Sequence, residues 1–140
     1  MIILVAEDEA LIALVLELAL GFAGHQVLGP AAEVDEALRL AEERRPDLAL
    51  LDIRLRDGGD GVRLARRLGE RWAVPCLFLS AQVTQARAAG DAALGLIGKP
   101  YDPDEVIAAV AAVGELLAGR RPDRVPRRLE LFGAWGSGAA

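Results

Sequence analysis

The chain of 140 residues has little cysteine, lysine or histidine, with one residue of each type. A single cysteine, Cys76, excludes an internal disulfide and a cysteine-based zinc site, and it fits a reducing compartment. The lone histidine, His25, makes no metal site by itself. We interpret His25 as a loop residue and Cys76 as a core residue.

The sequence also lacks an excess of basic residues and a long apolar run. Its 21 acidic residues outnumber its 16 basic ones, and the net charge is -5. A general nucleic-acid binder would need a cationic surface. Acidic residues at positions 7–9 and at Glu17 interrupt the first apolar stretches, which fall short of the ~20 residues of a spanning helix. We therefore expect a cytoplasmic protein that binds neither nucleic acid nor membrane.

The chain does contain short apolar runs that alternate with longer helical stretches, which is typical of a globular domain. The apolar runs predict strands at residues 2–6, 26–30, 48–52, 75–80 and 93–98. The predicted helices span residues 10–21, 34–43, 61–71, 84–89 and 102–117. Strands that are apolar along their whole length are covered on both faces. The pattern therefore predicts an α/β fold, with a five-stranded, doubly wound parallel sheet and five helices.

The composition changes after residue 118. Residues 119–140 contain five arginines and two acids, with no helix or strand periodicity. We divide the chain into one domain at residues 1–118 and an arginine-rich, partly disordered tail at residues 119–140, which is too short for an output domain. The apolar residues that could hold part of this tail on the domain are Leu129, Leu131, Phe132 and Trp135. Residues 136–140 are expected to be disordered.

Polar residues lie where the predicted strands end. The first strand runs into Glu7, Asp8 and Glu9, and the third ends at Asp52. Ligands of an open parallel sheet bind beyond the carboxyl ends of its strands. If the first and third strands are neighbours, these carboxylates converge and repel one another. A divalent cation with oxygen ligands would offset the repulsion, and so would the ammonium of Lys99, which follows the fifth strand.

Four motifs at four strand ends resemble the receiver domain of bacterial response regulators. They are the acids at positions 7–9, Asp52 after Leu-Ala-Leu-Leu, Ser80-Ala81 after Cys-Leu-Phe-Leu, and Lys99-Pro100. The resemblance covers residues 1 to about 118. It implies the flavodoxin-like (CheY-like) arrangement of the sheet, with strand order 2-1-3-4-5.

The resemblance also implies a role for each matching residue. Asp52 would be the phosphoryl acceptor, which attacks a phosphohistidine on a histidine kinase or phosphotransfer protein. The direct ligands of Mg2+ (or Mn2+) would be Asp8, Asp52 and the backbone carbonyl of Arg54. Glu7 would bind the ion through a water molecule. The side chains that would stabilise the phosphoryl group are Ser80 and Lys99.

Simpler roles stay open for the same residues. The acids at positions 7–9 also favour the N-terminus of a helix. Asp52 alone could be a turn residue, and Ser80 is an ordinary strand-end hydroxyl. Lys99 could be a solvated surface lysine. Its occurrence at the matching position, in a chain with 15 arginines, favours a functional role.

The sequence departs from the receiver pattern at two places. In the loop after the acceptor, Arg56 replaces the usual proline, and the Asp60-Gly61 pair comes one residue late. Leu96 stands at the switch position, three residues before Lys99, where the family has an aromatic side chain. The signal would then be read out differently or weakly.

The leading interpretation is a stand-alone response regulator of a two-component phosphorelay. It would be a Mg2+-dependent phosphoacceptor, not an enzyme, and would signal by contact with a downstream protein. The alternative is an interaction or dimerisation module with a receiver fold that needs no phosphorylation. A flavodoxin-like cofactor binder is disfavoured because the first turn after a strand is acidic. Residues 10–21 and 102–117 are more apolar than one buried stripe requires, which predicts a contact surface for the helical bundle of a kinase or for a second copy of the chain. A homodimer through either helix is a further hypothesis.

Overall fold

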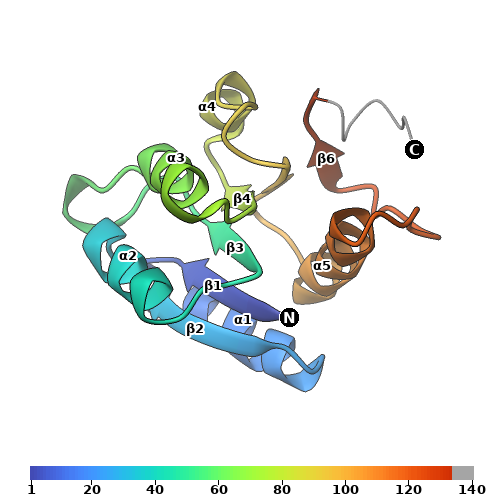
Figure 1. Cartoon of the computed structure of the whole chain (residues 1–140), viewed down its shortest axis with the longest axis horizontal. Coiled ribbons are helices and arrows are strands. Elements are labelled where there is room, and N and C mark those ends of the chain that lie inside the picture. The colour runs from blue at the N-terminus through green and yellow to red at the C-terminus, as the bar shows by residue number, and fades with distance from the viewer. Residues whose placement is uncertain (134–140) are drawn as a thin grey trace.

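Apolar runs of the sequence form the strands of one sheet, and the stretches between them form helices (Figure 1). The computed structural model describes residues 1–133. The sequence predicts that Trp135 helps to hold the tail on the domain and that residues 136–140 are disordered. These residues lie outside the described part of the chain. The strands are β1 (Ile2–Ala6), β2 (Gln26–Ala31), β3 (Leu48–Leu51), β4 (Cys76–Ser80), β5 (Gly95–Gly98) and β6 (Leu129–Leu131). The helices are α1 (Ala10–Phe22), α2 (Val34–Glu43), α3 (Gly61–Trp72), α4 (Val83–Ala88) and α5 (Pro103–Leu117), with a 3-10 turn at Arg56–Gly58.

The sheet has the strand order β2-β1-β3-β4-β5-β6, with β1 to β5 parallel. The predicted α/β fold and the order 2-1-3-4-5 are therefore confirmed. β2 and β6 form the two edges of the sheet (Figure 1). The strand order reverses next to β1, which places a crevice at the carboxyl ends of β1 and β3.

The predicted number of five strands is too low by one. β6 pairs antiparallel with β5, with Leu129 opposite Ile97 and Leu131 opposite Gly95. Three residues are too few for a detectable alternation of apolar and polar side chains. The strand conformation of β6 depends on the edge of β5, and no local pattern reveals a tertiary contact of this kind. Part of the predicted tail therefore belongs to the sheet.

Two apolar layers, one on each face of the sheet, make up the core. Along β1, Leu4 and Ala6 face a layer that α2, α3 and α4 complete. Ile3 and Val5 face the opposite layer, which α1 and α5 complete. All four residues are at most 1% exposed, as expected for a strand that is covered on both faces.

The helix ends follow their local sequence signals. Asp102 caps α5 with a capping box to Glu105, and Pro103 occupies the first turn. Asp60 caps α3, and its side chain accepts a hydrogen bond from the Val62 amide at 2.8 Å. α2 ends three residues before Pro46, because proline disfavours helical backbone at the residue before it.

The two most apolar helices differ in what they expose. On α5, Val106, Val110 and Val113 are fully buried against the sheet. On α1, by contrast, a stripe of large apolar side chains is exposed: Leu11 (73%), Leu14 (49%), Val15 (39%), Leu18 (53%) and Phe22 (92%). Within residues 1–133, no helix has both the length and the apolar character to cross a membrane. Both helices have more apolar side chains than the core requires, but the exposed large ones lie mainly on α1.

The structure places the lone cysteine in the core and the lone histidine in a loop. Cys76 is 1% exposed in β4, and burial raises the pKa of its thiol to about 12. His25 lies between α1 and β2, with its Nδ1 atom 3.0 Å from the N-terminal nitrogen. Burial and the adjacent positive N-terminus lower the pKa of His25.

Candidate functional site

The acids of the first turn and Asp52 meet at the carboxyl edge of the sheet because β1 and β3 are paired. Ala6 lies opposite Leu51, so Glu7 and Asp52 leave the sheet side by side. The Asp52 amide donates to the Ala6 carbonyl at 2.9 Å, and the Glu7 amide donates to Ala31 at 2.8 Å. Backbone hydrogen bonds therefore hold both acids at the end of the central strands.

Three carboxylates form a tight cluster at this edge. One side-chain oxygen from each of Glu7, Asp8 and Asp52 lies within 4.8 Å of the other two. Glu7 is only 4% exposed and Asp52 only 8% exposed, while Asp8 is half-buried. Negative charges at this spacing and burial are costly unless a cation compensates them.

Lys99 supplies a cation directly to the cluster. Its Nζ atom lies 2.6 Å from Glu7 Oε1, 2.7 Å from Asp52 Oδ2 and 3.3 Å from Glu9 Oε2. An ammonium has three donors, and three different carboxylates lie around this one. Lys99 follows β5, so its side chain reaches past the end of β4 to join residues that follow β1 and β3.

The pKa shifts reflect this balance of burial and pairing. Burial raises the pKa of Glu7, although its hydrogen bonds with Lys99 and with the Glu9 amide oppose the shift. For Lys99, burial opposes the charged form, but its hydrogen bonds to Asp52 and Glu7 outweigh that cost and raise the pKa. The ammonium of Lys99 therefore stays charged at neutral pH.

Asp52 is also fixed through its backbone and its second oxygen. Its Oδ1 atom accepts a hydrogen bond from the Ile53 amide at 2.7 Å. Gly61, the first residue of α3, lies against the Asp52 backbone, and a Cβ atom at this position would overlap the Asp52 carbonyl. The Gly61 amide donates to the Ile53 carbonyl at 2.7 Å. The start of α3 can approach this closely only because residue 61 is glycine.

The other two candidate residues of the site, Arg54 and Ser80, make different backbone contacts. Arg54 and Asp60 form an isolated antiparallel bridge. The two hydrogen bonds of this bridge use the Ile53 carbonyl and the Leu55 amide. The Arg54 carbonyl therefore takes no part in the bridge. Ser80 is fully buried, and its Oγ atom accepts from the Gln82 amide at 3.0 Å. Among the described residues, no hydrogen bond joins the Ser80 hydroxyl to the carboxylate cluster.

Tyr101 is a neighbour of the cluster to which sequence reasoning assigned no role. Within residues 1–133, its hydroxyl is the one buried side-chain polar atom without a hydrogen-bond partner. Burial and then the negative charge of Glu7 raise its pKa to about 12. Its position two residues after Lys99 is the only sequence signal, and its burial depends on tertiary packing against the apolar layer that α1 and α5 complete.

Two members of the cluster, Glu7 and Asp8, line a cavity of about 250 Å3 beside the start of α1. Its polar lining includes Glu7, Asp8 and Arg56, with Pro30 and Ala32 on the β2 side. Carboxylate and carbonyl oxygens are the donors that a hard divalent cation such as Mg2+ prefers. The residues present therefore fit such an ion, with access from solvent.

Comparisons with known proteins agree with the fold. The family model described as the response regulator receiver domain matches residues 3–111. The chain therefore belongs to the response regulator receiver domain family.

Relatives of the chain include regulators from several bacteria. The phyllosphere-induced regulator PhyR of Methylorubrum extorquens is 37% identical over 78% of this chain. The transcriptional regulatory protein PdtaR of Mycobacterium tuberculosis is 34% identical over 77% of this chain. These matches cover 42% and 54% of the two relatives, so the chain spans about half of their length. The structure of NtrX from Brucella abortus superimposes with a TM-score of 0.77 at 28% identity, over 84% of this chain and 27% of that one.

The contact between Gly61 and Asp52 predicts opposite effects of one substitution at two glycines of α3. Gly61→Ala forces the Asp52 backbone to move, and we expect a loss of about 1–3 kcal/mol in the free energy of unfolding. Gly69→Ala is the matched control, because a Cβ atom there meets nothing within 4 Å. It should stabilise the helix by roughly 0.5–1 kcal/mol. Urea unfolding measures both values, and equal effects of the two substitutions would contradict the close approach at Gly61.

Proposed function

We propose that the chain accepts a phosphoryl group on Asp52 from a phosphohistidine of a histidine kinase or phosphotransfer protein. The observation that carries this proposal is the 2.7 Å contact of Asp52 with the only lysine of the chain, inside a carboxylate cluster that opens to solvent. A carboxylate is a suitable nucleophile for a covalent phosphoryl intermediate. An adjacent ammonium stabilises the charge of the group that is transferred.

In the proposed transfer, a carboxylate oxygen of Asp52 attacks the phosphorus atom of the phosphohistidine. The new O–P bond forms as the N–P bond breaks, and the imidazole nitrogen keeps the electron pair and takes up a proton from water. In the structure, the Ile53 amide binds one Asp52 oxygen and Lys99 binds the other. Lys99 must therefore exchange its bond with Asp52 for one with a phosphoryl oxygen.

The proposed metal ligands are those of the carboxylate cluster and its loop. Asp8, Asp52 and the Arg54 carbonyl would hold Mg2+ or Mn2+, and Glu7 would bind the ion through a water molecule. The ion, when bound, neutralises negative charge on the carboxylates and the phosphoryl oxygens. Glu7 and Asp52 now share the Lys99 ammonium, so the metal and Lys99 together would balance the charges of the site.

Ser80 and Leu96 would connect the phosphoryl group to the rest of the domain. Ser80 would donate its hydroxyl hydrogen to a phosphoryl oxygen, because the bond from the Gln82 amide uses the hydroxyl oxygen only as an acceptor. Leu96, at the switch position, is 2% exposed within the sheet. Because a buried leucine does not alternate between a buried and an exposed position, the response would involve the loops after β4 and β5 instead.

The relatives suggest the kind of output. PhyR of Bartonella quintana is described as an anti-anti-sigma factor, and PdtaR as a transcriptional regulatory protein. We propose that this chain likewise acts through contact with a downstream protein. It would be a signalling protein and not a conventional enzyme.

Phosphorylation of Asp52 can be tested directly. Incubation with acetyl phosphate and Mg2+ should add one phosphoryl group per chain, and mass spectrometry of the intact protein and its peptides should place it on Asp52. Asp52→Asn should abolish the label. Asp57→Asn is the control, because Asp57 is an exposed acid in the adjoining loop and should leave the label intact.

Failure of wild-type protein to take up label from acetyl phosphate, and also from a cognate kinase with Mg2+, would reject the phosphoacceptor function. That result would favour the alternative, an interaction module that needs no phosphorylation.

We also propose that the chain forms a homodimer through the exposed apolar stripe of α1. The stripe runs from Leu11 to Phe22, and the exposed positions of α1 carry no charged side chain. An uncharged apolar stripe is complementary to itself, as a two-fold interface between identical chains requires. α5 is the weaker candidate, because its valines lie in the core and Leu117 is its exposed large apolar residue, at 38%.

Light scattering at high micromolar concentration should show a dimer. The double substitution Leu11→Gln with Leu18→Gln should give a folded monomer, because both side chains are exposed and neither belongs to the core. Leu117→Gln on α5 should leave the dimer intact. A monomeric wild-type protein, with and without phosphorylation, would contradict this interface.

A further inference from the structure

The C-terminal segment after α5 returns to the domain and docks beside the loop that carries Lys99. β6 pairs with β5, and the Phe132 amide donates to the Leu94 carbonyl at 2.8 Å. Leu129 is 6% exposed and Phe132 is 8% exposed. Gly95 permits the close approach of the two strands, because a Cβ atom there would meet the backbone of Glu130.

An ion pair fastens the same segment to α4. The Arg87 guanidinium donates to the Glu130 carboxylate from Nε at 3.0 and 3.1 Å and from Nη2 at 2.9 Å. Both side chains are partly exposed, so the pair contributes mainly orientation and little stability. It links β6 to α4.

Arg128, the residue before β6, contacts the Lys99 loop itself. Its Nη2 atom donates to the Gly98 carbonyl at 3.1 Å and to the Pro100 carbonyl at 2.6 Å. Its Nε atom lies 3.7 Å from Glu105 Oε2, on the first turn of α5. One guanidinium thus binds the residues on both sides of Lys99 and the helix that follows.

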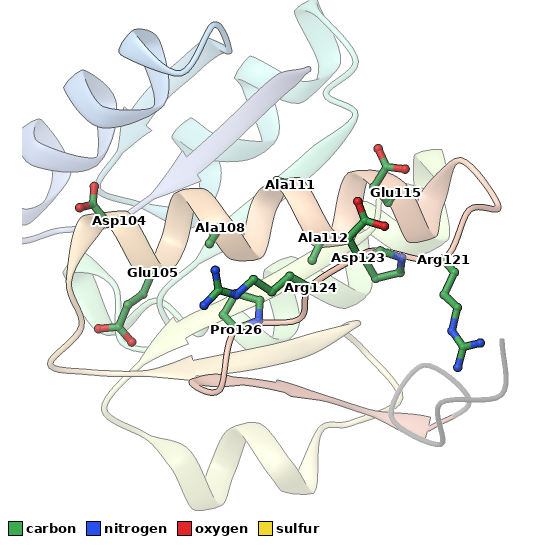
Figure 2. Close-up of a pocket in the computed structure, with 11 residues that line it drawn as sticks. Asp104, Glu105, Ala108, Ala111, Ala112, Glu115, Arg121, Asp123, Arg124 and Pro126 are labelled. Atoms are coloured by element: carbon green, nitrogen blue, oxygen red, sulfur yellow. The ribbon is translucent and has the colours of Figure 1, made fainter.

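The rest of the segment is held less closely. Residues 121–126 run beside α5 with a cavity of about 630 Å3 between them (Figure 2). The cavity is lined by Asp104, Ala108 and Glu115 of α5 and by Arg121 and Arg124 of the segment (Figure 2). In the described residues, the segment therefore contacts the Lys99 loop and β5 mainly through Arg128 and β6.

We propose that Arg128 is a positioning residue for Lys99, and that residues 128–132 thereby form a working part of the phosphoacceptor site. This inference rests on the proposed function of Asp52. By binding the carbonyls of Gly98 and Pro100, the planar guanidinium restricts the backbone from which the Lys99 side chain reaches Asp52. A rigid fork with several donors suits this role better than a flexible ammonium does.

The position of Arg128 predicts which steps depend on it. It contacts no member of the carboxylate cluster in the described residues, so it should influence metal binding only indirectly, through Lys99. It should affect the transfer of the phosphoryl group, in which Lys99 acts. It should also affect the mobility of the loop that carries Lys99. Removal of hydrogen bonds made by a charged group predicts changes on the order of tenfold in both.

Arg128→Ala tests the proposal in the full chain. We expect the rate of phosphorylation by acetyl phosphate to fall about tenfold, with a smaller change of Mg2+ affinity in calorimetry. Hydrogen exchange should accelerate in residues 94–101 and 128–132. Arg127→Ala removes the same charge from the neighbouring exposed residue, which has no side-chain ion pair or hydrogen bond in the described part of the chain, and should behave like wild type. Arg128→Lys should restore part of the rate, since an ammonium can still bind one carbonyl.

Two results would overturn the proposal. One is a wild-type phosphorylation rate in Arg128→Ala, and the other is equal losses in Arg127→Ala and Arg128→Ala, which would indicate a general charge effect. If wild-type protein takes up no phosphoryl group, the function proposed for Asp52 fails. Hydrogen exchange then still tests the restraint of the Lys99 loop by Arg128, and unchanged exchange in residues 94–101 would reject that restraint.

Discussion

The ammonium of Lys99 is the interaction on which the site depends. It binds Glu7, Asp52 and Glu9, which follow two different strands, and its own backbone follows a third. Without this cation, the buried carboxylates would repel one another at the sheet edge. In the proposed function, the same contact would prepare the site for chemistry, because an ammonium that already lies 2.7 Å from Asp52 is placed to stabilise an added anionic group.

The surrounding fold fixes both ends of this interaction. On the acid side, the pairing of β1 with β3 places Glu7 beside Asp52, and Gly61 allows α3 to pack against the Asp52 backbone. On the lysine side, β5 delivers Lys99, and Arg128 binds the carbonyls that flank it. A short strand from the end of the described chain therefore supports a site made by the beginning and middle of the chain.

The parts that could be predicted from sequence are those with a local or repeating signal. Fully apolar runs revealed the strands, and Asp102-Pro103 revealed the start of α5. The convergence of Glu7, Asp8 and Asp52 followed from the rule that parallel strands end at one edge. β6 could not be predicted, because three residues are too few to show a periodic pattern. The contacts of Arg128 could not be predicted either, because its partners are backbone carbonyls, which every residue has. The bond of Ser80 to Gln82 and the buried hydroxyl of Tyr101 likewise depend on tertiary packing.

The most direct test of the central claim is the pKa of the Lys99 ammonium in wild type and in Asp52→Asn. Lys99 is the only lysine, so nitrogen-15 labelling of lysine gives a single side-chain signal in nuclear magnetic resonance. The structure predicts a pKa above that of a free lysine side chain, because Asp52 and Glu7 stabilise the charged form. It also predicts a lower pKa in Asp52→Asn, where one of these charges is lost. An ordinary lysine pKa that Asp52→Asn leaves unchanged would contradict the account.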